Sequence, residues 1–207
     1  MIEFFDIEQN TDEWLDLRAG KPTGSKAGVI MANLGKAFSD TAKKYAVNIA
    51  IEQITGNRIP SDYNNGHMAR GHLQEPIACA YYEDRNFVDV MRGGFFLNDG
   101  VGISPDGLVG DNGLIEIKSV IPTVQFANVK RGKVDPAYKW QTIFQVKYCE
   151  KEWLDFVTYC DLYPEDKQLF THRIHADKLQ DEFKQVDERM AQFKELIEQT
   201  KDTIMRG

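Results

Sequence analysis

A short run near the middle of the chain, residues 114–118, alternates apolar residues with charged ones. Successive side chains of a β-strand point to opposite faces, so Ile115 and Ile117 share one face while Glu116 and Lys118 share the other. The large apolar neighbours argue against a loosely solvated surface strand. The pattern therefore predicts a partly buried strand whose second face holds either an ion pair or a shared metal and water site.

Asp106 precedes Glu116 by ten residues, and residues 111–113 (Asp-Asn-Gly) between them are typical of a turn. A hairpin at this turn would bring Asp106 beside Glu116. Two carboxylates suit Mg²⁺ or Mn²⁺, which keep several waters and need few protein ligands. Lys118 would then orient or help deprotonate an attacking water, or stabilise charge on a phosphate. The alternative is a surface hairpin with an ordinary Lys–Glu ion pair.

Glu75 is a further candidate ligand. Ala78, Cys79 and Tyr82 follow it at helical spacing, so Glu75 shares a helix face that we expect to be buried. A lone buried carboxylate is costly, and binding a metal would offset that cost. The spacing alone leaves an equal alternative, in which Glu75 is solvated at a helix start near Pro76.

The order of elements predicts an α/β fold with a central mixed sheet flanked by helices. Residues 10–56 read as helices that begin after Thr11, Ser25 and Ser39. A fourth helix is expected over residues 66–84, with Pro76 as a kink or as its first turn. The expected strands are 87–90, 94–97, 102–104, 114–118, 153–159 and 169–174, and the later helices are 123–130, 136–148 and about 177–205. We expect a single domain over residues 1–207, with a catalytic core at about 66–175.

The composition predicts a cytoplasmic protein without a membrane span. No apolar run approaches the roughly 18 residues that a span needs. The first residues are acidic rather than basic, and the three cysteines are widely spaced.

The net charge of −7 counts against a surface that binds nucleic acid everywhere, but a local basic groove remains compatible with it. Lys130 and Arg131, together with Lys133 and Lys139, form a basic run. This run is either a solvated loop or a contact to a DNA backbone.

These residues resemble the phage lambda exonuclease family of YqaJ-type viral recombinase nucleases, within the restriction-endonuclease-like PD-(D/E)XK superfamily. The core signature is residues 104–108 (Ser-Pro-Asp-Gly-Leu) with residues 113–118 (Gly-Leu-Ile-Glu-Ile-Lys). Flanking matches lie at residues 14–20 with 23–25, at 71–75 and at 138–141. Residue 24 is glycine where alanine is common, and residues 160–207 match no motif.

The resemblance implies a restriction-endonuclease-like core and assigns roles to the central residues. Asp106 and Glu116 would bind the metal together with the carbonyl of Ile117, and Glu75 would complete the shell directly or through water. Lys118 would position the nucleophilic water. Gln141 would lie beside the site and steady that water or Lys118.

Arg18 and Ser25 match the family's pocket for a terminal 5′-phosphate, with Ser104 nearby. A guanidinium fork suits a phosphate, and a hydroxyl at a helix N-terminus adds a donor. Taken alone, Arg18 reads better as a cation at a helix C-terminus, and only the surrounding motif favours phosphate binding.

The resemblance implies a Mg²⁺-dependent 5′→3′ exonuclease, with Mn²⁺ as a substitute, acting on double-stranded DNA ends. Its product would be 3′ single-stranded DNA for phage-type recombination by strand annealing. It also implies a homotrimer ring, a single-strand annealing protein as partner, and a phage or prophage origin. The alternatives are an endonuclease or helicase-associated nuclease of the same fold, and a DNA-end-binding module without catalysis.

Overall fold

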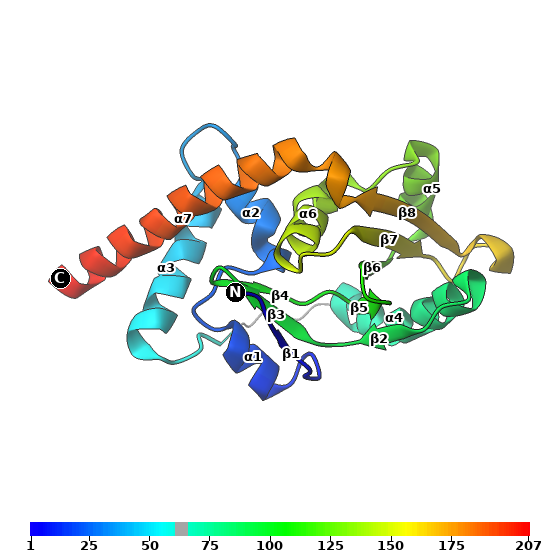
Figure 1. The fold of residues 1–207 in the computed structure, drawn as a ribbon, viewed down its shortest axis with the longest axis horizontal. Helices are drawn as coiled ribbons and strands as arrows, with labels where there is room; N and C mark the ends of the chain where they lie inside the picture. The colour runs from blue at the N-terminus through cyan, green and yellow to red at the C-terminus, as the bar shows by residue number, and fades with distance from the viewer. Residues whose placement is uncertain (61–65) are drawn as a thin grey trace.

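The computed structural model describes residues 1–60 and 66–207, and for residues 66–69 it describes the backbone only. The chain is an α/β fold with two sheets (Figure 1). The five-stranded mixed sheet has the order β2 (Val90–Arg92), β5 (Gly107–Val109), β6 (Gly113–Ser119), β7 (Trp153–Tyr159) and β8 (Leu169–His175). The three-stranded sheet has the order β1 (Glu3–Phe5), β3 (Phe95–Asn98) and β4 (Val101–Ile103).

Seven α-helices in the described ranges surround the sheets. They are α1 (Asp12–Arg18), α2 (Ala27–Met31), α3 (Asp40–Thr55), α4 (Gly66–Asn86), α5 (Pro122–Arg131), α6 (Lys139–Tyr148) and α7 (Gln180–Arg206). Short 3-10 turns lie at η1 (Gly24–Lys26), η2 (Pro136–Tyr138), η3 (Glu165–Lys167) and η4 (Ala176–Lys178). None of the helices in these ranges has an apolar stretch long enough to traverse a bilayer.

The hairpin expected from the turn at residues 111–113 is confirmed. Strands β5 and β6 pair antiparallel, with Gly107 opposite Ile115. On its other side β6 pairs in parallel with β7, with Glu116 opposite Phe156. Strand β6 is therefore hydrogen-bonded on both edges, at the centre of the sheet.

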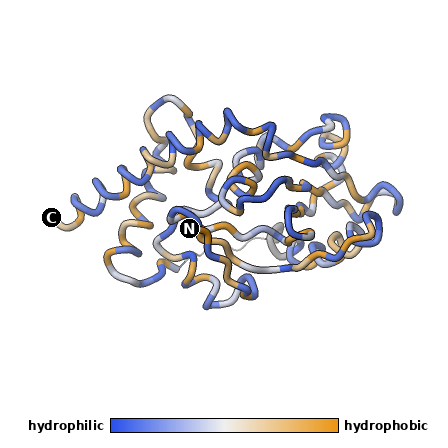
Figure 2. The backbone as a smooth tube through the Cα atoms, in the orientation of Figure 1, coloured by the Kyte–Doolittle hydropathy of each residue, from blue (hydrophilic) through white to orange (hydrophobic). Residues whose placement is uncertain are grey.

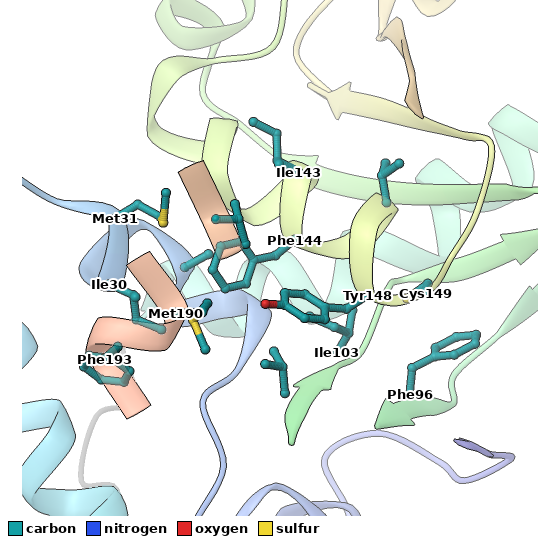
Figure 3. Close-up of a cluster of buried hydrophobic side chains, with 14 of the residues drawn as sticks. Ile30, Met31, Phe96, Ile103, Ile143, Phe144, Tyr148, Cys149, Met190 and Phe193 are labelled. Carbon is teal, nitrogen blue, oxygen red and sulfur yellow. The ribbon is translucent and has the colours of Figure 1, made fainter. Parts of the chain in front are cut away.

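Helices cover both faces of this sheet, as the alternation in β6 requires. Ile115 and Ile117 pack with Ala78 and Tyr82 of α4 on one face. Leu114 joins the larger core on the other face, where Phe144 of α6 is fully buried. Figure 3 shows Phe144 of this core among side chains from α2, α6 and α7.

The C-terminal helix α7 is amphipathic along its length. Val186, Met190, Phe193 and Ile197 are buried at helical spacing, and the polar residues between them face outward. Along the tube in Figure 2 this periodicity appears as alternating orange and blue segments. The helix packs against α2 and α3, and its end projects beyond them (Figure 1).

Two of the three predicted N-caps are confirmed. The hydroxyl of Thr11 accepts the N–H of Trp14, and that of Ser39 accepts the N–H of Ala42. The prediction for Ser25 is wrong. Ser25 lies inside the 3-10 turn η1 and caps no helix, because α2 starts only after that turn.

Two strands of the structure were not among the expected elements. Strand β1 pairs with β3, with Phe4 opposite Phe96. Strand β5, at residues 107–109, was not expected either. Both are three-residue strands, too short for a period-2 pattern to identify.

Arg189 on α7 holds the end of α2 and the segment after it in place through hydrogen bonds. Its side chain is buried, and its guanidinium donates to the carbonyls of Ile30, Ala32 and Lys36 at 2.9–3.0 Å. The guanidinium carbon also lies 3.6 Å from the ring centroid of Phe38. One side chain thus satisfies three carbonyls. One of them belongs to Ile30 in the last turn of α2, where helix carbonyls have no partner within the helix.

We predict that Arg189→Met lowers the free energy of unfolding by about 2–4 kcal/mol, because three carbonyls lose their donor. Urea denaturation followed by circular dichroism measures the change. The exposed Lys184 of the same helix provides a control, since Lys184→Met should change stability by less than about 0.5 kcal/mol. An Arg189→Met protein as stable as wild type would contradict this account.

Candidate functional site

Strands β5 and β6 bring Asp106 and Glu116 together. Asp106 directly precedes β5, and its Oδ2 accepts the backbone N–H of Ile117 at 2.6 Å. This bond fixes the Asp106 carboxylate against β6 beside Glu116. The prediction that the hairpin brings Asp106 beside Glu116 is therefore confirmed.

Glu116 is 1% exposed, although it carries a carboxylate into the middle of the sheet. Lys118 forms an ion pair with its Oε1. Gln141 Nε2 donates to the same oxygen at 2.5 Å, and Gln145 Nε2 donates to Oε2 at 2.5 Å. Three donors therefore offset the loss of water around a buried carboxylate.

The contact of Gln141 differs from the one that the resemblance implied. Gln141 was expected to steady Lys118 or a water, whereas its amide binds Glu116 itself. Gln145 was missed altogether. It follows Gln141 by four residues on α6, so both amides lie on one helix face. That spacing is the signal in the sequence that would have identified Gln145.

The site places two carboxyl groups beside the single ammonium of Lys118. Burial and the neighbouring Glu116 raise the pKa of Asp106 well above its ordinary value, against the opposing effect of Lys118. Burial alone would lower the pKa of Lys118, but Glu116 and Asp106 outweigh it and raise that pKa. The ammonium of Lys118 also lies 5.3 Å from the ring centroid of Tyr138.

The donor chemistry of this site fits a hard divalent cation. In the part of the chain with described side chains, no cluster of three or more Asp, Glu, His or Cys residues is arranged to hold a metal. A cation would therefore bind two carboxylates, with backbone oxygen and water completing its shell. Mg²⁺ accepts such a set, because it keeps most of its water.

Glu75 lies near this site but is paired elsewhere. Its Oε1 is 2.8 Å from Nη2 of Arg92, on strand β2. Arg92 is opposite Gly107 in the sheet, next to Asp106. The charge of Glu75 contributes to raising the pKa of Asp106. Arg92 was missed from the sequence, because it meets Glu75 only through the pairing of β2 with β5.

Arg18 forms a second cluster with two hydroxyls, as the resemblance implied. Its Nη2 is 3.2 Å from Ser25 Oγ, and its Nη1 is 3.4 Å from Ser104 Oγ. The ring of Trp14 lies 4.0 Å from the guanidinium, and Trp14 Nε1 donates to Ser104 Oγ at 2.9 Å. Ser104 comes two residues before Asp106, so the two clusters are joined by a short piece of backbone.

Arg18 is a partly buried cation without a carboxylate partner among the described residues. Burial lowers its pKa, and Tyr45 partly opposes this effect. The alternative role of Arg18, at the C-terminus of α1, does not account for its contacts. Its guanidinium binds side-chain hydroxyls, and no helix carbonyl is among its described partners. An anion in this cluster would supply the missing negative charge.

The basic run at residues 130–139 lies outside both clusters. Helix α5 packs against β7 and β8. Arg131 is engaged by Asn128 at 2.6 Å and by Asp135 at 3.5 Å, while Lys130 is exposed.

The profile of the YqaJ-like viral recombinase domain matches residues 13–152. An alkaline exonuclease (LHK-Exo) from Laribacter hongkongensis is 33% identical, with 95% of this chain and 99% of that one covered and a TM-score of 0.77. Its complex with dAMP gives a TM-score of 0.78 at the same identity and coverage.

A phage-related exonuclease from Haemophilus somnus 129PT is 14% identical, with a TM-score of 0.67 over 89% of this chain and 96% of that one, and shows the same fold. The search of curated protein sequences gave no match. The resemblance drawn from the sequence is confirmed by the profile match and by the 33% identical structure. The chain therefore belongs to the YqaJ-like viral recombinase domain family.

Proposed function

We propose that this protein is a Mg²⁺-dependent 5′→3′ exonuclease that degrades one strand of double-stranded DNA from a 5′-phosphorylated end. Its family and the 33% identical alkaline exonuclease make it a nuclease acting on DNA. One observation carries the finer proposal: the carboxylate cluster and the Arg18 cluster are joined through Ser104 and Asp106. A DNA end held at Arg18 would have its first phosphodiester bonds beside the carboxylates.

Asp106, Glu116 and the carbonyl of Ile117 would hold Mg²⁺, with Mn²⁺ as a substitute. Glu75 would complete the shell directly or through water, after exchanging its present partner Arg92. When bound, the cation supplies a Lewis acid that stabilises charge on the phosphate and eases the deprotonation of water. Burial and the neighbouring Glu116 raise the pKa of Asp106, and a bound cation would offset both effects, which supports this assignment.

The side chains around the carboxylates have separate tasks in this proposal. Lys118 orients the attacking water and stabilises the charge that grows on the phosphate. Gln141 holds one oxygen of Glu116 so that the carboxylate keeps its direction. Together they place the nucleophile and the reacting phosphate in one geometry, which is where much of the rate acceleration in such reactions arises.

Arg18, Ser25 and Ser104 would bind the terminal 5′-phosphate. The partial burial of Arg18 beside hydroxyls, with no carboxylate partner among the described residues, supports this role, because an anionic ligand would complete its partners. Lys130 and Arg131 remain candidates for contacts to the DNA backbone outside the site. A homotrimer ring would let an acidic exterior coexist with a basic channel, and the 3′ strand would pass to an annealing protein.

We predict that Asp106→Asn lowers the rate of Mg²⁺-dependent degradation of linear duplex DNA by on the order of 10³-fold. The loss of a metal ligand removes several kcal/mol of transition-state stabilisation. Asparagine has nearly the same shape and keeps an acceptor for the N–H of Ile117, so folding should survive. A time course of released nucleotides measures the rate.

The exposed Asp111 in the nearby turn is the matched control, and Asp111→Asn should degrade DNA at the wild-type rate. A covalently closed plasmid should remain intact with either protein, because an exonuclease needs an end. Degradation by Asp106→Asn at close to the wild-type rate would contradict the assignment of Asp106 as a metal ligand. Cleavage of the closed plasmid would show that the protein is an endonuclease.

We also predict that wild-type protein degrades 5′-phosphorylated duplex about 10- to 100-fold faster than 5′-hydroxyl duplex. This range corresponds to the roughly 1.5–3 kcal/mol of a hydrogen bond to a charged group. Arg18→Ala should abolish most of this preference while leaving slow Mg²⁺-dependent hydrolysis.

The experiment compares both duplexes with wild type, Arg18→Ala and a control, Lys43→Ala, whose lysine is exposed on α3. The control should keep the full preference. If Arg18→Ala keeps it as well, Arg18 does not sense the end, and its role reduces to that of a cation at the C-terminus of α1.

A further inference from the structure

We propose that Gln145 is a positioning residue of the carboxylate site, retained for its hydrogen bond to Glu116 and not for the stability of the fold. This inference rests on the proposed function, in which Glu116 binds a divalent cation. It concerns what holds that ligand in a binding orientation before any cation arrives.

Gln145 meets Glu116 inside the protein. Its side chain is 1% exposed, as is that of Glu116, and its Nε2 donates to Glu116 Oε2 at 2.5 Å. Gln141, one helical turn earlier, donates to Oε1. Each oxygen of the carboxylate therefore has its own amide donor from α6, and the carboxylate plane cannot turn without breaking one of these bonds.

The other end of the Gln145 amide has no partner in the described part of the chain. Its Oε1 is buried and accepts no hydrogen bond from the described residues. An unsatisfied buried acceptor lowers the stability of a fold. Turning the amide over would not remove the problem, because Oε1 would then meet the oxygen of Glu116 and Nε2 would lack an acceptor. The orientation is therefore fixed by the carboxylate.

An apolar side chain of similar size would serve the core better at this position. Methionine has nearly the same volume and length, and it would remove the unsatisfied oxygen. Stability therefore does not explain a glutamine at residue 145. Its donor to Glu116 does, provided that Glu116 is needed in one orientation.

The position of Lys118 explains why the Glu116 carboxylate needs a second hydrogen bond to keep its orientation. Its ammonium already contacts Glu116 Oε1. Without Gln145, Oε2 is free to turn toward the same ammonium, and both oxygens of Glu116 then face Lys118. A carboxylate closed onto Lys118 in this way is a poorer ligand, because a cation has to break the ion pair first. Loss of an outer-shell partner of this kind typically weakens metal binding about 10- to 100-fold.

The test is the substitution Gln145→Met, with Gln125→Met as its matched control. Gln125 is another fully buried glutamine, on α5, but its amide is satisfied: it donates to the carbonyl of Gln168 at 3.1 Å and accepts from Thr158 Oγ1 at 2.6 Å. Both variants are the same chemical change at a buried position of a helix. Calorimetric titration of DNA-free protein with Mn²⁺ gives the affinity, and thermal unfolding without metal gives Tm.

Gln145→Met should bind Mn²⁺ about 10- to 100-fold more weakly than wild type, with an unchanged or higher Tm. Gln125→Met should bind Mn²⁺ as wild type does at a temperature where it is folded, with a Tm several degrees lower. The opposite effects of the two substitutions on Mn²⁺ affinity and on Tm distinguish a positioning role of Gln145 from a structural one.

Wild-type affinity in Gln145→Met overturns the role of Gln145 alone. A Tm lower in Gln145→Met than in Gln125→Met also overturns it, because Gln145 would then be structural. Wild-type protein that binds no Mn²⁺ overturns the metal-dependent function itself, and with it this inference.

Discussion

The burial of the Glu116 carboxylate is the constraint on which the arrangement of the site depends. A charge in the central strand of a sheet is stable only where donors replace the lost water. Lys118 supplies one from the same strand, and Gln141 and Gln145 supply two from α6. Helix α6 must therefore cross the sheet at Glu116, which fixes its position relative to β6 and β7.

The features predicted correctly from the sequence depend on local chemistry. The features that were missed depend on contacts between segments that are distant in the sequence. Alternation of apolar and charged residues identified β6, and the turn at residues 111–113 placed Asp106 beside Glu116. Strand β1 has only three residues and exists through its pairing with β3. Arg92 meets Glu75 through the pairing of β2 with β5. Spacing along one segment cannot reveal such partners.

In the proposed function, a short backbone segment between the two clusters would couple recognition of a DNA end to its hydrolysis. Ser104 belongs to the Arg18 cluster, and Asp106 belongs to the carboxylate cluster. A displacement of this segment would move both together. On the other side of the Arg18 cluster, Ser25 lies just before α2, and Arg189 fastens the end of α2 to α7. The C-terminal helix α7 thus supports the segment that follows Ser25, and none of its described residues belongs to either cluster.

The central claim is that Asp106 and Glu116 share one divalent cation. The most direct measurement is the anomalous scattering of Mn²⁺ in crystals of wild-type protein grown with a 5′-phosphorylated duplex. The account predicts an anomalous peak between these two carboxylates, within about 2.0–2.4 Å of an oxygen of each. A Mn²⁺ peak elsewhere, with Glu116 still bound only by Lys118, Gln141 and Gln145, would contradict it.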